Sequence, residues 1–107
     1  MKAIKNLTET NDGRVYVYLA NDRVGNRFMR QAESEGFTFA DGEKPTGRGY
    51  AEIMAVNDDG TINFVGFAGR MAFGGGADAV GGRKLIRVDY AKYEAGEDDF
   101  IIRIKHE

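Results

Sequence analysis

The sequence predicts an α+β fold: a mostly antiparallel sheet of about five to six strands, one main helix packed on a face, and a long Gly-rich loop. Short runs rich in β-branched and aromatic residues occur in consecutive pairs, and turn residues separate the members of each pair. One stretch, residues 21–36, instead has the spacing of an amphipathic helix. The 107 residues are enough for a single domain, residues 1–107, with a modest core.

The first pair of predicted strands comprises residues 2–7 and 14–20. Asn11-Asp12-Gly13 lies between them and is typical of a hairpin turn, because Asp and Gly tolerate the positive φ that such turns need. In the second strand two valines and a leucine alternate with two tyrosines. We therefore expect both faces of this strand to be at least half covered.

The predicted helix begins at Asn21 or Asp22, since either side chain can accept a hydrogen bond from the first turn. Val24, Phe28 and Ala32 then recur every four residues and form an apolar stripe. Gly36 ends the helix, because glycine adopts the left-handed conformation most easily.

The remaining predicted strands follow in order along the chain. A short extended piece and a loop with the only proline lead to a hairpin, and two further strands come after the glycine-rich stretch. These elements are the extended piece 37–39, the loop 40–47, the strands 50–56 and 61–67 with their turn at 57–60, and the strands 85–90 and 100–105. The buried rows expected in the last two strands are Ile86, Val88 and Tyr90, and Phe100, Ile102 and Ile104.

Composition excludes several classes of function. A formal charge of −2 argues against a dedicated nucleic-acid binder, which usually carries a strong basic excess. The absence of cysteine excludes disulfides and thiolate chemistry. No apolar run approaches the ~20 residues of a membrane span, and the first residues lack a signal-peptide core. We expect a soluble, cytoplasmic protein with no membrane partner.

Residues for catalysis are sparse. The sole histidine, His106, is next to the last residue, and the sole serine, Ser34, has no base beside it in sequence. The run Glu97-Asp98-Asp99 lacks the spaced oxygen ligands of a calcium loop, so a solvated loop is favoured over a weak calcium site. We expect no enzyme, no cofactor and no metal.

The stretch Gly66 to Arg83 contains seven of the fifteen glycines. Its segment 76–83 has the glycine spacing of a P-loop but not the required Lys-Ser/Thr, and residues 74–79 match GxGxxA without the strand and helix that this motif needs. Two interpretations stay open, a flexible connector and a site for an anionic partner.

As a site, the stretch would act as an anion-binding nest. Gly74, Gly75 and Gly76 would donate backbone N–H groups to a phosphate or a similar anion. The cationic partners would be Arg70, Arg83 and Lys84, and Phe73 or Phe67 would offer a ring for stacking.

Three segments resemble small uncharacterised proteins of Firmicutes phages and mobile elements. These segments are residues 27–46, 53–62 and 87–90. The resemblance spans most of the chain, carries no catalytic motif and implies a genomic setting in which small accessory or counter-defence proteins act by binding. It also implies the cytosol of the host cell if the protein is phage-encoded.

Two hypotheses of function follow. The first is a non-enzymatic binding protein, a counter-defence factor that sequesters a small anionic molecule such as a nucleotide signal or blocks a host effector protein. The alternative is a structural or protein-interaction module with no small-molecule ligand. A small sheet domain with exposed edges often dimerises, so a homo-oligomer is also expected.

Overall fold

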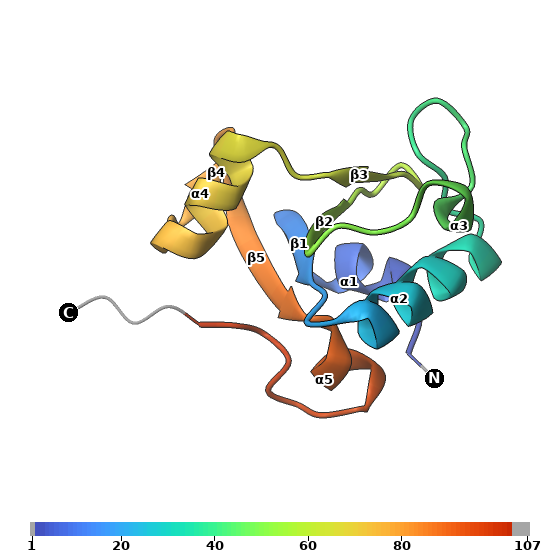
Figure 1. Ribbon diagram of the computed structural model, residues 1–107. Helices are drawn as coiled ribbons and strands as arrows, with labels where there is room; N and C mark the ends of the chain where they lie inside the picture. The colour runs from blue at the N-terminus through green and yellow to red at the C-terminus, as the bar shows by residue number, and fades with distance from the viewer. Residues whose placement is uncertain (1, 104–107) are drawn as a thin grey trace.

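The computed structural model describes residues 2–103 and has an α+β fold (Figure 1). The helices are α1 (Lys5–Thr10), α2 (Asp22–Ser34), α3 (Pro45–Arg48), α4 (Phe67–Gly75) and α5 (Tyr90–Glu94). The strands are β1 (Arg14–Tyr18), β2 (Ile53–Val56), β3 (Ile62–Phe64), β4 (Ala79–Val80) and β5 (Arg83–Asp89).

The five strands form one mixed sheet in the order β3-β2-β1-β5-β4. Three neighbouring pairs are antiparallel, but the central pair, β1 and β5, is parallel, with Val15 opposite Ile86 and Val17 opposite Val88. The sheet is therefore made of a β2–β3 hairpin and a β4–β5 hairpin joined through β1, which pairs antiparallel with β2 and parallel with β5. Short turns predict antiparallel neighbours only, and the parallel pair joins strands that are about seventy residues apart.

Both hairpins have turns that suit their sequences. The β2–β3 hairpin turns at residues 57–60, as the sequence predicts, and Asp59 accepts hydrogen bonds from the N–H and hydroxyl of Thr61. The β4–β5 hairpin turns at Gly81 and Gly82, which both have positive φ, as a two-residue turn of this kind requires.

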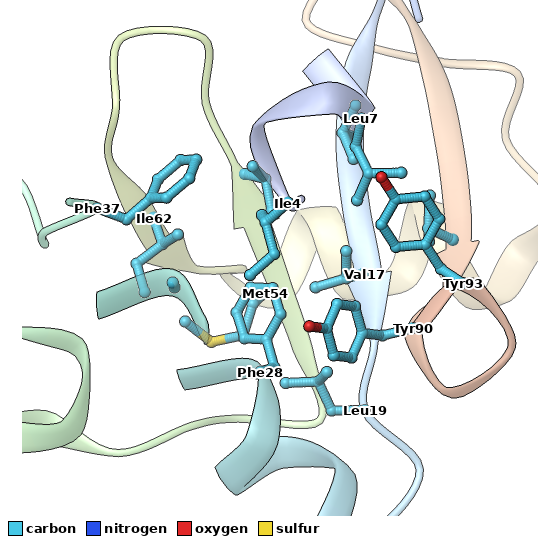
Figure 2. Close-up of a cluster of buried hydrophobic side chains, with 14 of the residues drawn as sticks. Ile4, Leu7, Val17, Leu19, Phe28, Phe37, Met54, Ile62, Tyr90 and Tyr93 are labelled. Atoms are coloured by element: carbon cyan, nitrogen blue, oxygen red, sulfur yellow. The ribbon is translucent and has the colours of Figure 1, made fainter. Parts of the chain in front are cut away.

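The main core lies between one face of the sheet and the helices α1, α2 and α5 (Figure 2). Figure 2 shows side chains from these helices converging on strand residues such as Val17 and Met54. Phe28 of α2 meets Tyr90 of α5 edge-on, with 5.0 Å between ring centroids, and both are buried. This face is covered by the three helices together with Phe37 and Phe39.

The opposite face of the sheet carries a second, smaller cluster. It comprises Tyr16, Ile53, Ala55, Val65 and Leu85, with Ala72, Phe73 and Val80 packed against them. Two of the covering residues, Ala72 and Phe73, come from α4, which lies beside β4 and β5 and apart from the other helices in Figure 1. One short helix thus covers a face that spans five strands.

The longest helix, α2, follows the sequence prediction closely. The side chain of Asn21 accepts a hydrogen bond from the N–H of Val24, so it caps the first turn. Gly36 follows the helix with φ 89°. The buried stripe includes Val24, Phe28 and Ala32.

Three predicted elements were wrong. Residues 5–10 form α1 where a strand was expected over 2–7, because Ile4 and Leu7 are three residues apart and both reach the core. The carboxylate of Glu35 accepts hydrogen bonds from the N–H groups of Ile4 and Lys5, which have no partner within the helix.

The strand expected over 85–90 is present as β5, but it ends one residue early, because Tyr90 begins α5. Asp89 caps this helix by accepting from the N–H of Lys92. In place of a strand over 100–105, the described part of this segment makes one bridge, between Ile101 and Val88. Phe100 and Ile102 are half-buried, and Ile104 lies outside the described residues. The third wrong element is the Gly-rich loop.

Candidate functional site

A nine-residue helix, α4, occupies the first half of the stretch expected to be a long Gly-rich loop. Gly66 precedes it, and Gly76, with φ 79°, ends it. Ala77 then donates its N–H to the carbonyl of Ala72, a bond that closes the last turn. The stretch is therefore a helix, a cap and a hairpin rather than a connector.

Arg87 holds the C-terminal end of α4. Its side chain is buried at 5 % exposure and donates from Nε to the carbonyl of Phe73 at 3.0 Å. Its Nη2 donates to the carbonyls of Ala72 and Ala77 at 3.0 and 2.7 Å. The last carbonyl groups of a helix lack intrahelical donors and carry partial negative charge, so a buried guanidinium satisfies both needs.

Gly69 allows α4 to lie close to the sheet. A Cβ at this position would be 2.5 Å from Cγ1 of Val65 and 3.2 Å from the hydroxyl of Tyr16. Any larger residue would push the helix outward. The position of α4 is thus fixed at its middle by Gly69 and at its end by Arg87.

An open hollow of about 550 Å³ lies between α4 and the start of β2. Its lining residues are Glu52, Ile53, Phe67, Arg70, Met71, Phe73 and Gly74. Two of them project from the helix: Phe67 is 81 % exposed and Met71 is 61 % exposed. The hollow is therefore mostly apolar and bordered by two uncovered apolar side chains.

Two opposite charges border the hollow. Glu52 comes just before β2, where its carbonyl accepts the N–H of Leu19 at 2.7 Å, and Arg70 lies on α4. Both residues are exposed, and neither side chain has an ion-pair partner within residues 2–103. The hollow thus offers one free carboxylate and one free guanidinium.

The seven residues predicted as an anion site do not come together. Arg70, Phe73 and Gly74 line the hollow, while Gly75 and Gly76 end the helix behind it. Arg83 donates from Nη2 to the carbonyl of Gly13 at 3.1 Å. Lys84 lines a different hollow of about 420 Å³, together with Asp78 and Arg103.

The backbone of Gly74, Gly75 and Gly76 also does not present the free N–H groups that an anion-binding nest needs. Gly74 and Gly75 lie in the last turn of α4, where N–H groups bond back along the helix, and the N–H of Gly76 donates to Ala72. What this end of the helix presents is carbonyl oxygen, and the cation that it binds is the chain's own Arg87. This differs from the anion nest expected.

The other candidate groups have structural partners. Asp99 pairs with Lys92 at 3.0 Å, and this hydrogen bond lowers the pKa of the Asp99 carboxyl below its ordinary value. The hydroxyl of Ser34 donates to the carbonyl of Gln31 at 2.8 Å. His106 lies outside the described residues. Among residues 2–103, no three carboxylate or imidazole groups lie close enough together to hold a metal ion.

Comparison with protein-family models, with curated proteins and with solved structures finds no match for this chain. The resemblance to phage and mobile-element proteins therefore stays a prediction. In the described part of the chain, no helix combines the length and the apolar character needed to cross a lipid bilayer.

Sequence reasoning missed Glu52, Met71 and Arg87 as parts of this site. The signal for Met71 was available, since Phe67 and Met71 are four residues apart, as on one face of a helix. No local pattern marks Glu52, which reaches the hollow only because β2 and α4 are brought together by the sheet. Arg87 resembles an exposed residue in an alternating strand, and its burial depends on α4.

Proposed function

We propose that this chain is a non-enzymatic protein-interaction module that buries the face of α4 against another polypeptide. The single observation that carries the proposal is the state of α4 itself. Arg70 is the one charged residue among its nine, yet none of the nine is buried. A helix that is apolar nearly all round is normally covered by protein, and α4 is covered on its sheet side only.

The shape of the site favours a polypeptide over a small molecule. A ligand seated in the hollow would contact Ile53 and Phe73 at its base. It would cover only the side of Phe67 that lines the hollow and would leave the rest of this side chain, which is 81 % exposed, in water. A polypeptide segment can fill the hollow and cover the projecting side chains at once, and aromatic and methionine side chains are enriched at such interfaces.

A small anionic molecule is the second candidate ligand. It is favoured by one observation, that Arg70, Phe73 and Gly74 line the same hollow. Glu52 weakens this candidate, because its carboxylate lines the hollow as well and repels an anion. The counter-defence roles expected from the sequence, sequestering a nucleotide signal or blocking an effector protein, correspond to these two ligands.

The test is a selection of displayed random peptides on the immobilised wild-type protein, after which the affinity of each selected peptide is measured on the Phe67→Ser/Met71→Ser variant. We expect peptides with large apolar side chains that bind the wild-type protein and lose at least about tenfold in affinity on the variant. Phe64→Ser is a matched control, because it removes an exposed phenyl group that packs on Phe39 at 5.3 Å, away from α4. Peptides that bind wild type and variant alike would overturn the proposal.

Native mass spectrometry with a nucleotide panel distinguishes a small anionic ligand from a polypeptide partner. The interaction module predicts no bound nucleotide. A nucleotide that binds the wild-type protein and is lost on Arg70→Ala, but not on Arg83→Ala, would instead support the small-molecule ligand, because only Arg70 lines the hollow.

A further inference from the structure

We infer that the polypeptide bound by the α4 face is a second copy of this chain, in a two-fold symmetric dimer. The inference rests on the function proposed above and names its partner. In such a dimer the same patch is used on both subunits, so whatever projects from the patch must fit a recess within it.

The α4 face has both a projecting part and a recess. Phe67 and Met71 project from the helix, and the hollow beside them is about 550 Å³, with Ile53 and Phe73 among its lining residues. When two copies meet face to face, the projecting side chains of each copy enter the hollow of the other. Each subunit then covers the apolar groups that the other leaves exposed.

The two charges of the α4 face are also complementary when two copies are related by a two-fold axis. Glu52 is on the sheet side of the hollow and Arg70 is on the helix side. A two-fold axis that lays the α4 of one copy over the hollow of the other brings Arg70 of each copy toward Glu52 of its mate. Two ion pairs form per dimer, and they use the charges that have no ion-pair partner within residues 2–103.

The balance of charge also permits self-association. The hollow is lined by one acidic and one basic residue, so two identical patches carry no net charge to repel each other. The whole chain has a formal charge of only −2. A strongly acidic or strongly basic partner would match only one of these two charges, whereas a second copy matches both.

Sedimentation velocity from roughly 1 μM to 1 mM tests the dimer. We expect a concentration-dependent monomer–dimer equilibrium for the wild-type protein. Phe67→Ser/Met71→Ser is expected to weaken dimerisation roughly a hundredfold or more, because it removes the central apolar contacts.

Charge reversal tests the arrangement. Glu52→Arg and Arg70→Glu are each expected to weaken the dimer about tenfold, because each change alters both symmetric contacts. The double variant Glu52→Arg/Arg70→Glu restores dimerisation. Glu9→Arg and Arg30→Glu, matched reversals of exposed residues on α1 and α2, leave it unchanged.

The outcomes separate this inference from the proposed function. A protein that stays monomeric to 1 mM, or a dimer that survives Phe67→Ser/Met71→Ser, overturns the inference. A dimer that is indifferent to single charge reversal, or not rescued by the double one, also overturns it. If peptides still bind the α4 face of a monomer, the proposed function stands and only the identity of the partner is wrong.

Discussion

The guanidinium of Arg87 lies on the ring of Phe73, with Cζ 5.6 Å from the ring centroid, and donates from Nε to the carbonyl of the same residue. This one pair joins strand β5 to the last turn of α4. The helix that carries the proposed interaction surface is therefore anchored by a buried cation as well as by Ala72 and Phe73, which pack against the sheet.

Loss of the Arg87 side chain is expected to destabilise the fold. Arg87→Met removes three hydrogen bonds to carbonyl groups at and just after the end of α4 and is expected to lower the free energy of unfolding by about 3 kcal/mol in urea titration. Arg87→Lys keeps the charge but not the planar set of donors, so an intermediate loss is expected. A loss below about 1 kcal/mol for the methionine variant would mean that Arg87 does not hold the helix.

The exposed side chains of α4 are expected to contribute little to stability. Phe67→Ser and Met71→Ser should each change the free energy of unfolding by no more than about 0.5 kcal/mol at concentrations where the protein is monomeric. Phe73→Ser, which removes the ring beneath Arg87, should cost about 2 kcal/mol or more. Equal losses for Phe67 and Phe73 would show that Phe67 is packed and not available for binding.

Gly25 and Tyr50 form a tight contact in the main body of the fold. A Cβ on Gly25 would lie 2.5 Å from the ring of Tyr50, whose hydroxyl donates to Asp22. Gly25→Ala is therefore expected to destabilise the protein by about 1–3 kcal/mol despite the better helix propensity of alanine.

In a Tyr50→Ser background the clash is absent, and Gly25→Ala should stabilise the protein by up to about 1 kcal/mol. A double-mutant cycle by urea unfolding measures this coupling. The same sign of effect in both backgrounds would contradict the contact.

Acid is expected to loosen the loop before α3. The hydrogen bond from Arg48 lowers the pKa of the Asp41 carboxyl below its ordinary value of 3.8. A carboxyl with a lowered pKa in the folded state stabilises the fold above that ordinary value, and the contribution is lost as pH falls through the folded-state pKa.

Asp41→Asn should therefore lower Tm near pH 7, and its difference from the wild-type protein should shrink steadily below about pH 4. Thermal unfolding followed by circular dichroism over this range measures the effect. A difference in Tm that stays constant with pH would show that the Asp41–Arg48 pair has no such linkage.

Local sequence signals predicted α2 and the β2–β3 hairpin because their determinants are close in sequence. The cap at Asn21, the stripe through Phe28 and the turn at Asp59 act within a few residues. The parallel β1–β5 pair was not predictable in this way, since no residue of Arg14–Tyr18 specifies a neighbour far along the chain.

The candidate surface overlaps the stretch singled out from the sequence, but the structure of that stretch differs from the prediction. Glycine lowers helix propensity by roughly 1 kcal/mol, so a segment with Gly69, Gly74 and Gly75 resembles a loop. Tertiary contacts reverse this preference, because Gly69 fits against Tyr16 and Arg87 satisfies the final carbonyls. The glycines expected to bind an anion serve instead to place and end a helix.

Hydroxyl-radical footprinting of Phe67 and Met71 tests the central claim most directly, with the buried Met29 and Met54 as internal references. In dilute solution both exposed side chains should react readily. At concentrations that favour self-association, or with a selected peptide bound, both should be protected while the references do not change. If Phe67 and Met71 each react as fast in the bound protein as in the free protein, the assignment of the α4 face as the interaction surface is contradicted.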